Sequence, residues 1–175
     1  QQWRIAVLRK VDAAHQKEME TQAKYSHLFN NMPILYMQER VVFDAQGTAI
    51  DTVYVDVNAH FERSFYPLDE VAGKSGSTVF PESMPQFMPI IDIVLKEKRS
   101  VTFPYYHKPV NIFYEVVICP SYQQDTVDIF CIDSTALHNA QKKVDSVNRK
   151  LALALNVANI IPWKWNLTNH TILCD

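Results

Sequence analysis

Side chains that could perform acid–base or nucleophilic chemistry are sparse in this sequence. There is no Gly-x-Ser-x-Gly turn, and three glycines in 175 residues leave no glycine-rich loop for a nucleotide. An isomerase-like pocket would need a buried acid, and Glu115 is the candidate that interrupts an apolar stretch. Alternation places Glu115 on the side opposite to Ile112, Tyr114, Val116 and Ile118, so it should face solvent or a flanking helix. The sequence therefore predicts no enzymatic activity for this chain.

Metal-binding and redox patterns are missing as well. The cysteines form no CxxC pair and are odd in number, so we expect neither a zinc site nor a disulfide framework. Cys119 and Cys131 lie in strand-like stretches and should be buried as small hydrophobic residues. His60 and His107 have no partner at metal-ligand spacing and should be surface or hydrogen-bonded residues. No metal or cofactor is predicted.

Aromatic side chains recur through the middle of the chain at spacings that leave two interpretations open. They either form a solid core, which is the more common outcome, or line a cavity between a sheet and its helices. Asn58 either faces a ligand in that cavity or caps a helix, and we favour the cap. A ligand would be small and mostly apolar. The candidate pocket residues are Asn58, Phe61, Phe65, Phe80, Phe87, Ile91, Phe103, Tyr105 and Tyr114.

The order of predicted elements is that of an α+β domain. A helix rich in Ala, Lys, Gln and Glu ends before Pro33. A β-hairpin with its turn at Gly47 follows, then short helices and an amphipathic helix whose start is ambiguous because it contains Pro85 and Pro89. Three more strands complete a five-stranded antiparallel sheet with helices on one face. The predicted strands are 34–44, 50–57, 101–107, 110–119 and 125–132, and the main helices are 4–29, 84–98 and 135–159.

The helix after the last strand carries an apolar ladder with coiled-coil spacing. Its steps alternate between three and four residues, which keeps one narrow seam on the helix and favours a partner helix. Three of the seven positions are alanine, so the helices should pack closely but weakly. We therefore predict a homodimer formed through the flanking helices. The seam residues are Leu137, Ala140, Val144, Val147, Leu151, Ala154 and Ala158.

Over about residues 25–135, the sequence resembles the PAS family of sensor domains. Residues 54–61 (Tyr-Val-Asp-Val-Asn-Ala-His-Phe) are similar to the family's Val-Asn-x-x-Phe step, and residues 69–74 to its Glu-Glu-(apolar)-x-Gly-Lys step. Residues 132–135 (Ile-Asp-Ser-Thr) resemble its closing Asp-Ile-Thr. Residues 64–66 (Ser-Phe-Tyr) depart from the Thr-Gly-Tyr of many members.

The resemblance implies a domain division and a function. The divisions are a lead-in helix at 1–30, a PAS sensor domain at 31–135, a heptad signalling helix at 136–159 and the start of a second, truncated PAS-like domain at 160–175. Tandem PAS units joined by heptad helices are typical of bacterial multi-PAS sensor histidine kinases. The resemblance thus implies a sensory or relay module of a two-component system, with the downstream kinase domains as partners. The alternative is a ligand-free dimerisation module of a transcription regulator or a cyclic-dinucleotide enzyme.

The resemblance also assigns roles to single residues. Asp133 and Thr135 would couple the sheet to the signalling helix, with a plain helix cap as the alternative. His27 is a poor phospho-acceptor, because Leu28 stands where an acidic residue is needed. Residues 74–80 lack the cysteine of flavin-binding members, and residues 84–99 lack the histidine of haem-binding members.

Charge and hydropathy limit the partners. The net charge of −2 and the scattered basic residues argue against nucleic-acid binding. No stretch is long and apolar enough to span a bilayer, so a membrane is expected only through a larger parent protein. Trp3, Arg4, Arg9 and Lys10 fit either the flank of a membrane helix in that parent or a solvated helix face. We expect a cytoplasmic location, with an inner-membrane anchor in the parent as the open alternative.

Overall fold

The computed structural model describes residues 2–158, 163–166, 168 and 171–174. The chain divides into two units, Gln1–Asp133 and Ser134–Asp175. The first contains a long helix and the globular domain, and the second contains a helix followed by a short hairpin.

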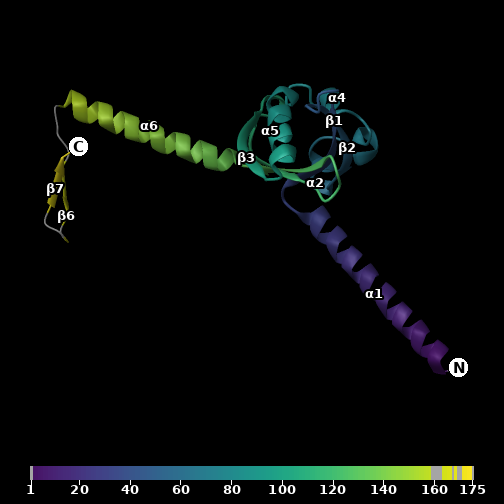
Figure 1. Cartoon of the computed structure of the whole chain (residues 1–175). Helices are drawn as coiled ribbons and strands as arrows, with labels where there is room; N and C mark the ends of the chain where they lie inside the picture. Colours follow the sequence, from purple (N-terminus) through teal and green to yellow (C-terminus); the bar gives the residue numbers. More distant parts are fainter. Residues whose placement is uncertain (1, 159–162, 167, 169–170, 175) are drawn as a thin grey trace. The chain divides into compact units, whose positions relative to one another are not determined.

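The globular domain (Figure 1) is built on one antiparallel sheet of five strands, in the order β2-β1-β5-β4-β3. The predicted strands are confirmed to within a few residues. This arrangement, with helices packed on one face, confirms the predicted α+β fold class. The strands are β1 (Leu35–Phe43), β2 (Ala49–Val57), β3 (Val101–His107), β4 (Ile112–Pro120) and β5 (Thr126–Asp133).

The hairpin between β1 and β2 closes as its turn residues predict. Gly47 has a φ of 79°, a conformation that glycine adopts without a steric penalty. The Asp44 side chain accepts hydrogen bonds from the backbone N–H groups of Gln46 and Thr48 at 2.9 and 2.8 Å. An acidic turn residue and a glycine together therefore fix this connection.

The helices of the domain pack on one face of the sheet and bury the core between them and the strands. Phe61, Ile91 and Val94 from the helices are fully buried, as are Val116 and Ile118 from β4. The helices are α2 (Ala59–Ser64), α3 (Leu68–Val71), α4 (Gly76–Val79) and α5 (Met84–Glu97), with a 3-10 turn η1 at Lys108–Val110.

Two details of the helices differ from the sequence-based expectation. The helix α4 was not predicted, because its four residues carry no periodic signal. The ambiguity at α5 resolves toward the early start: the helix begins at Met84, and Pro85 lies in the first turn, where a backbone N–H is not needed. Pro89 lies inside the helix.

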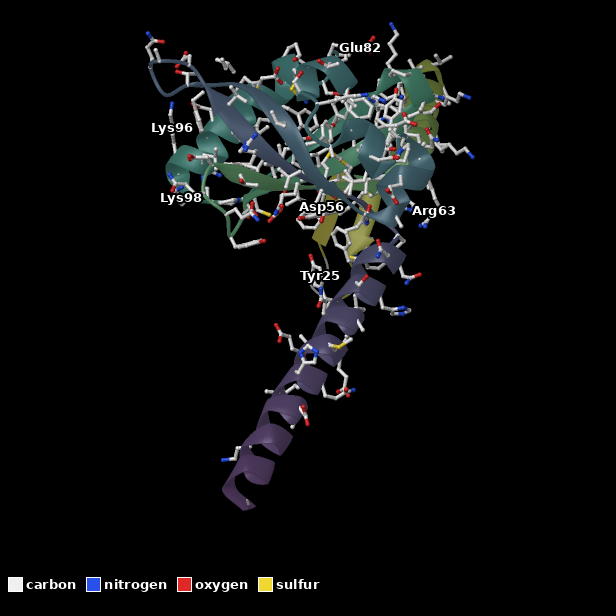
Figure 2. All side chains as sticks on the ribbon, turned by 90° about the vertical axis from the view of Figure 1, so that its right-hand side faces the viewer. Tyr25, Asp56, Arg63, Glu82, Lys96 and Lys98 are labelled. Atoms are coloured by element: carbon white, nitrogen blue, oxygen red, sulfur yellow. The ribbon has the colours of Figure 1, made fainter. Side chains whose placement is uncertain are left out.

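The helix α1 (Gln2–Asn31) precedes the domain and is exposed along most of its described side chains. Figure 2 shows these side chains projecting from the helix. Its last turns contact the domain closely. The Phe29 ring packs edge-to-face on Tyr36 with centroids 4.8 Å apart, and Tyr36 in turn contacts Phe130. The outer face of the sheet is thus partly covered at this end.

The second unit contains α6 (Thr135–Val157), β6 (Trp163–Asn166) and β7 (Thr171–Cys174). Six of the seven predicted seam residues lie within α6, and Ala158 is its C-cap residue. The strands β6 and β7 pair antiparallel. The predicted second PAS-like domain at 160–175 stays a prediction, and part of it lies outside the described residues. No helix in the described ranges is long and apolar enough to cross a membrane.

Candidate functional site

The candidate site is a cavity of about 40 Å³ between the sheet and the helices. All five strands contribute to its wall, together with α2, α5 and the segment between α2 and α5. The wall is formed by Leu35, Met37, Glu39, Tyr54, Phe61, Phe65, Phe80, Ser83, Met84, Phe87, Tyr105, His107, Tyr114 and Cys131.

Six of the nine sequence-predicted pocket residues line this cavity: Phe61, Phe65, Phe80, Phe87, Tyr105 and Tyr114. The other three do not. Ile91 is fully buried in the hydrophobic core, and Phe103 packs edge-to-face on Phe87 with centroids 5.3 Å apart. Asn58 has a structural role instead.

Asn58 is fully buried and connects three elements. Its Oδ1 accepts hydrogen bonds from the backbone N–H of Phe61 at 3.0 Å and of Tyr36 at 3.2 Å. Its Nδ2 donates to the carbonyl oxygens of Ile34 at 2.9 Å and Phe29 at 3.4 Å. The predicted helix cap is therefore confirmed, and Asn58 also ties the end of α1 to the start of β1.

Sequence reasoning missed the most unusual residue of the site, Glu39. Its side chain lines the cavity, and the residue is only 1% exposed. Glu39 pairs in register with Tyr54, next to a shift in the β1–β2 register of the kind that a β-bulge produces. Bulges often re-aim side chains beside functional sites. The earlier candidate, Glu115, is exposed as predicted.

The Glu39 carboxyl group is poorly satisfied. Its Oε2 atom is fully buried and has no hydrogen-bond partner. Burial raises the pKa of Glu39 to about 7, although the hydroxyl groups of Thr52 and Tyr54 lower it in part. Burial and the nearby Glu39 carboxyl raise the pKa of Tyr54 well above its ordinary value. A buried acid with a pKa near 7 is typical of functional sites.

His107 also belongs to the cavity wall, although it was not among the predicted pocket residues. It is buried, and its Nδ1 lies 3.1 Å from the Tyr105 hydroxyl, which is 2.6 Å from the Ser83 hydroxyl. Burial lowers the pKa of His107 below its ordinary value. His107 is hydrogen-bonded, as expected, but it lines the site rather than the surface. The signal for Glu39 was strand alternation, since it shares a face of β1 with buried neighbours.

Cys131 lies in the wall on β5, whereas Cys119 is only half-buried. Burial, and secondarily the Glu39 carboxyl, raise the pKa of Cys131 to about 12, so its thiol is unreactive at neutral pH. Across the part of the chain that the structure describes, no group of three or more His, Cys, Asp or Glu residues could hold a metal ion.

Two larger surface hollows adjoin the cavity, and Phe65 lines all three. One, of about 250 Å³, shares Phe65, Phe80, Ser83 and His107 with the cavity. The other, of about 260 Å³, shares Leu35, Phe65, Tyr114 and Cys131 with it. The half-buried Phe65 side chain therefore lies where the cavity meets both hollows.

The strand β5 links the cavity to α6 along the chain. Cys131 lines the cavity, β5 ends at Asp133, and α6 begins at Thr135. Asp133 pairs in register with Tyr114, another wall residue. The helix cap is Ser134, between the two predicted coupling residues, and its carbonyl accepts from the His138 N–H at 2.9 Å.

Comparisons with known proteins give a fold and no sequence family. No protein-family model matches the chain, and no curated protein matches it. Among solved structures, an RNA-binding light-oxygen-voltage receptor aligns with a TM-score of 0.53 at 15% identity, over 76% of this chain and 38% of that chain. Light-oxygen-voltage domains are PAS-type domains. The globular domain has a PAS-like fold.

Two further structures align with the chain at lower TM-scores. A sensory box sensor histidine kinase from Vibrio cholerae gives a TM-score of 0.46 at 19% identity, over 69% of this chain and 97% of that chain. A C-terminal domain from Streptococcus mutans gives 0.44 at 11% identity, over 66% and 87%.

Proposed function

We propose that this PAS-like domain is a sensory or relay module of a bacterial two-component sensor histidine kinase. It would act in the cytoplasm as a homodimer and pass a signal to the downstream kinase domains of its parent chain. The observation that carries this proposal is the continuous path from the cavity wall through β5 to α6. Cys131 lies two residues before the end of β5, and α6 begins two residues after that end. A change in cavity packing that moves β5 also moves the first turn of α6.

The surface of α6 supports the dimer in this proposal. The side chains of Leu137, Val144, Val147 and Leu151 are 73%, 53%, 62% and 56% exposed in the single chain. A seam of aliphatic residues at heptad spacing buries its apolar surface when a second copy pairs with it. The signal would then be a change in how the two α6 helices pack.

The attachment of α1 supports a relay in which both ends of the domain take part. The Phe29 carbonyl accepts from Asn58, and the Asn30 side chain accepts from the Ala59 N–H at 3.3 Å. The same residue, Asn58, caps α2, which contributes Phe61 to the cavity wall. A displacement of α1 therefore reaches the cavity through one buried side chain.

The second candidate is a ligand-free dimerisation module of a transcription regulator or a cyclic-dinucleotide enzyme. The observation that favours it is the size of the cavity, since 40 Å³ is far below the roughly 300–1,000 Å³ of common ligand pockets. Neither flavin nor haem is part of either proposal. The sequence of the full-length protein beyond Asp175 distinguishes the two, because a histidine kinase needs a dimer helix with a phospho-accepting histidine and an ATP-binding domain.

The proposed coupling is tested by replacing Asp133 and Thr135 with alanine in the full-length protein. We expect the autophosphorylation rate to change by about two- to thirtyfold, which corresponds to coupling energies of 0.5–2 kcal/mol. Asp145→Ala is the matched control, because Asp145 is exposed on α6 away from the seam. If the double variant keeps both the basal rate and the response of the wild-type protein, the coupling role is wrong.

A further inference from the structure

The buried Glu39 carboxyl is an incomplete hydrogen-bonding site. A buried polar atom without a partner destabilises the fold, and native proteins rarely keep one without a reason. Glu39 Oε2 is such an atom, and Glu39 lines the cavity. The fold therefore holds an open acceptor at the cavity wall, where a ligand that donates a hydrogen bond would satisfy it.

The charged groups of the cavity wall indicate which charge that ligand carries. Within the described part of the chain, its wall contains no lysine or arginine, and Glu39 is its single carboxylic acid. The other titratable groups of the wall favour their neutral forms. Burial lowers the pKa of His107 and raises those of Tyr54 and Cys131. A cation would thus meet one carboxylate and no competing positive charge.

The remaining wall suits an organic cation better than a metal ion. Seven aromatic rings surround the cavity, and aromatic faces attract ammonium groups through their quadrupoles. A hard metal ion would need several oxygen ligands, whereas Glu39 offers one carboxyl group. The aromatic residues are Tyr54, Phe61, Phe65, Phe80, Phe87, Tyr105 and Tyr114.

The dimensions limit how such a molecule fits. A cavity of 40 Å³ has room for a group of the size of an ammonium head but not for a whole ring-containing molecule. The adjoining hollow of about 250 Å³ lies beyond Phe65 and Phe80 and includes Glu82, which Figure 2 shows on the domain. A second acidic residue at this hollow adds to the attraction for a cation.

We propose that the cavity binds a small primary organic amine, with its ammonium group on Glu39 and its apolar body extending past Phe65 into the adjoining hollow. This inference rests on the proposed sensory function and narrows it to a chemical class of ligand. Binding would move Phe65, which closes α2, and would fill the wall beside β5. The amine would thereby supply the packing change that the relay needs.

The test is a titration of the isotope-labelled chain with benzylamine and with n-butylamine, followed by NMR chemical shifts at about pH 8, where Glu39 is ionised. Benzyl alcohol is the neutral probe of matched shape. We expect saturable shifts at cavity residues with both amines and at least about tenfold weaker binding of the alcohol, as expected for the loss of a charge-assisted hydrogen bond. The amine–alcohol comparison uses the wild-type chain and so does not depend on the folding of any variant.

Substitution of Glu39 tests whether the ammonium group of the amine binds there. Glu39→Gln should weaken benzylamine binding by at least about tenfold, whereas Glu115→Gln, which changes an exposed glutamate, should leave it within about twofold. The proposal is overturned if neither amine shifts the cavity residues, if the alcohol binds equally well, or if Glu39→Gln binds like the wild type. A water molecule that merely fills the cavity would produce these negative results. Unchanged coupling in the Asp133 and Thr135 variants would instead disprove the relay while leaving the amine site intact.

Discussion

At the scale of single residues, Glu39 is the most informative residue of the site because its burial destabilises the folded state. A buried carboxylate without a full set of partners destabilises the folded state, and an uncharged side chain of similar shape would remove that cost. Glu39 nevertheless lies in the middle of β1, beside a register shift and an aromatic wall. Residues that break the local rules of folding are expected at functional sites.

The pH dependence of stability should show this cost directly. The pKa of Glu39 is about 7 in the folded state against an ordinary value of 4.5, so the folded state holds more protons between these values. Stability therefore falls as the pH rises through this interval, by up to about 3 kcal/mol. We expect Glu39→Gln to gain up to that amount relative to the wild type between about pH 5 and pH 8, measured by urea unfolding.

Titration of the residues around Glu39 should not contribute to this pH dependence. Raised pKa values keep Tyr54 and Cys131 neutral throughout the interval. Partial burial would raise the pKa of Asp51, but hydrogen bonds from Ser77 and Thr52 hold it below its ordinary value, so Asp51 stays ionised. His107 is present in both proteins and cancels in the difference. Glu115→Gln is the matched control, and a flat difference between Glu39→Gln and wild type would contradict the raised pKa.

The site was only partly predictable from the sequence, and the miss at Glu39 has a physical cause. Large aromatic residues favour burial by their type, which is why seven of them were predicted at the cavity, and six of these line it. Glu39 lies between Gln38 and Arg40, and this polar run is typical of an exposed segment. Glu39 lies on the same face of β1 as Leu35, Met37 and Val41. The two-residue alternation of the strand therefore predicts that Glu39 is buried, whereas its charge favours an exposed position.

At the scale of elements, Asn58 is the joint between α1, β1 and α2. Asn58→Ala removes two acceptor and two donor interactions from a fully buried position. We expect it to lower the free energy of unfolding by about 2–4 kcal/mol, since buried backbone groups lose their partners. Thermal or urea unfolding measures this, with the exposed Asn148→Ala on α6 as the control.

A more selective variant separates the cap from the connection to α1. Asn58→Asp keeps the acceptor for Phe61 and Tyr36 but loses the donor to Phe29 and Ile34. Hydrogen exchange should then accelerate in the last turns of α1 while α2 stays protected. Equal protection of α1 in Asn58→Asp and wild type would show that Asn58 does not attach this helix.

The elements themselves were largely predictable, because turns and caps carry strong local signals. Gly47, Asn58 and the alternation of the strands fix most boundaries within a few residues. What failed was α4, whose single turn is set by packing. Gly76 at its start is buried, and a side chain there would meet Thr52 and Met84. Tertiary contacts of this kind leave no periodic pattern in the sequence.

At the scale of the whole molecule, the proposed relay depends on pairing of two chains through α6. The helix has an exposed aliphatic seam and no buried residue in the single chain. Alanine at three of the seven seam positions favours close but weak packing, which suits a helix pair that must shift between two arrangements. The proposed relay therefore requires dimer formation.

Native mass spectrometry of the purified chain tests that condition most directly. If two chains pair through α6, we expect a species of twice the 20.2 kDa chain mass for the wild type and for Leu153→Asp. Val147→Asp, which places a charge in the seam at a similarly exposed position, should shift the protein to the monomer. A wild-type chain that is monomeric at micromolar concentration, or a Val147→Asp variant that remains dimeric, would contradict the account.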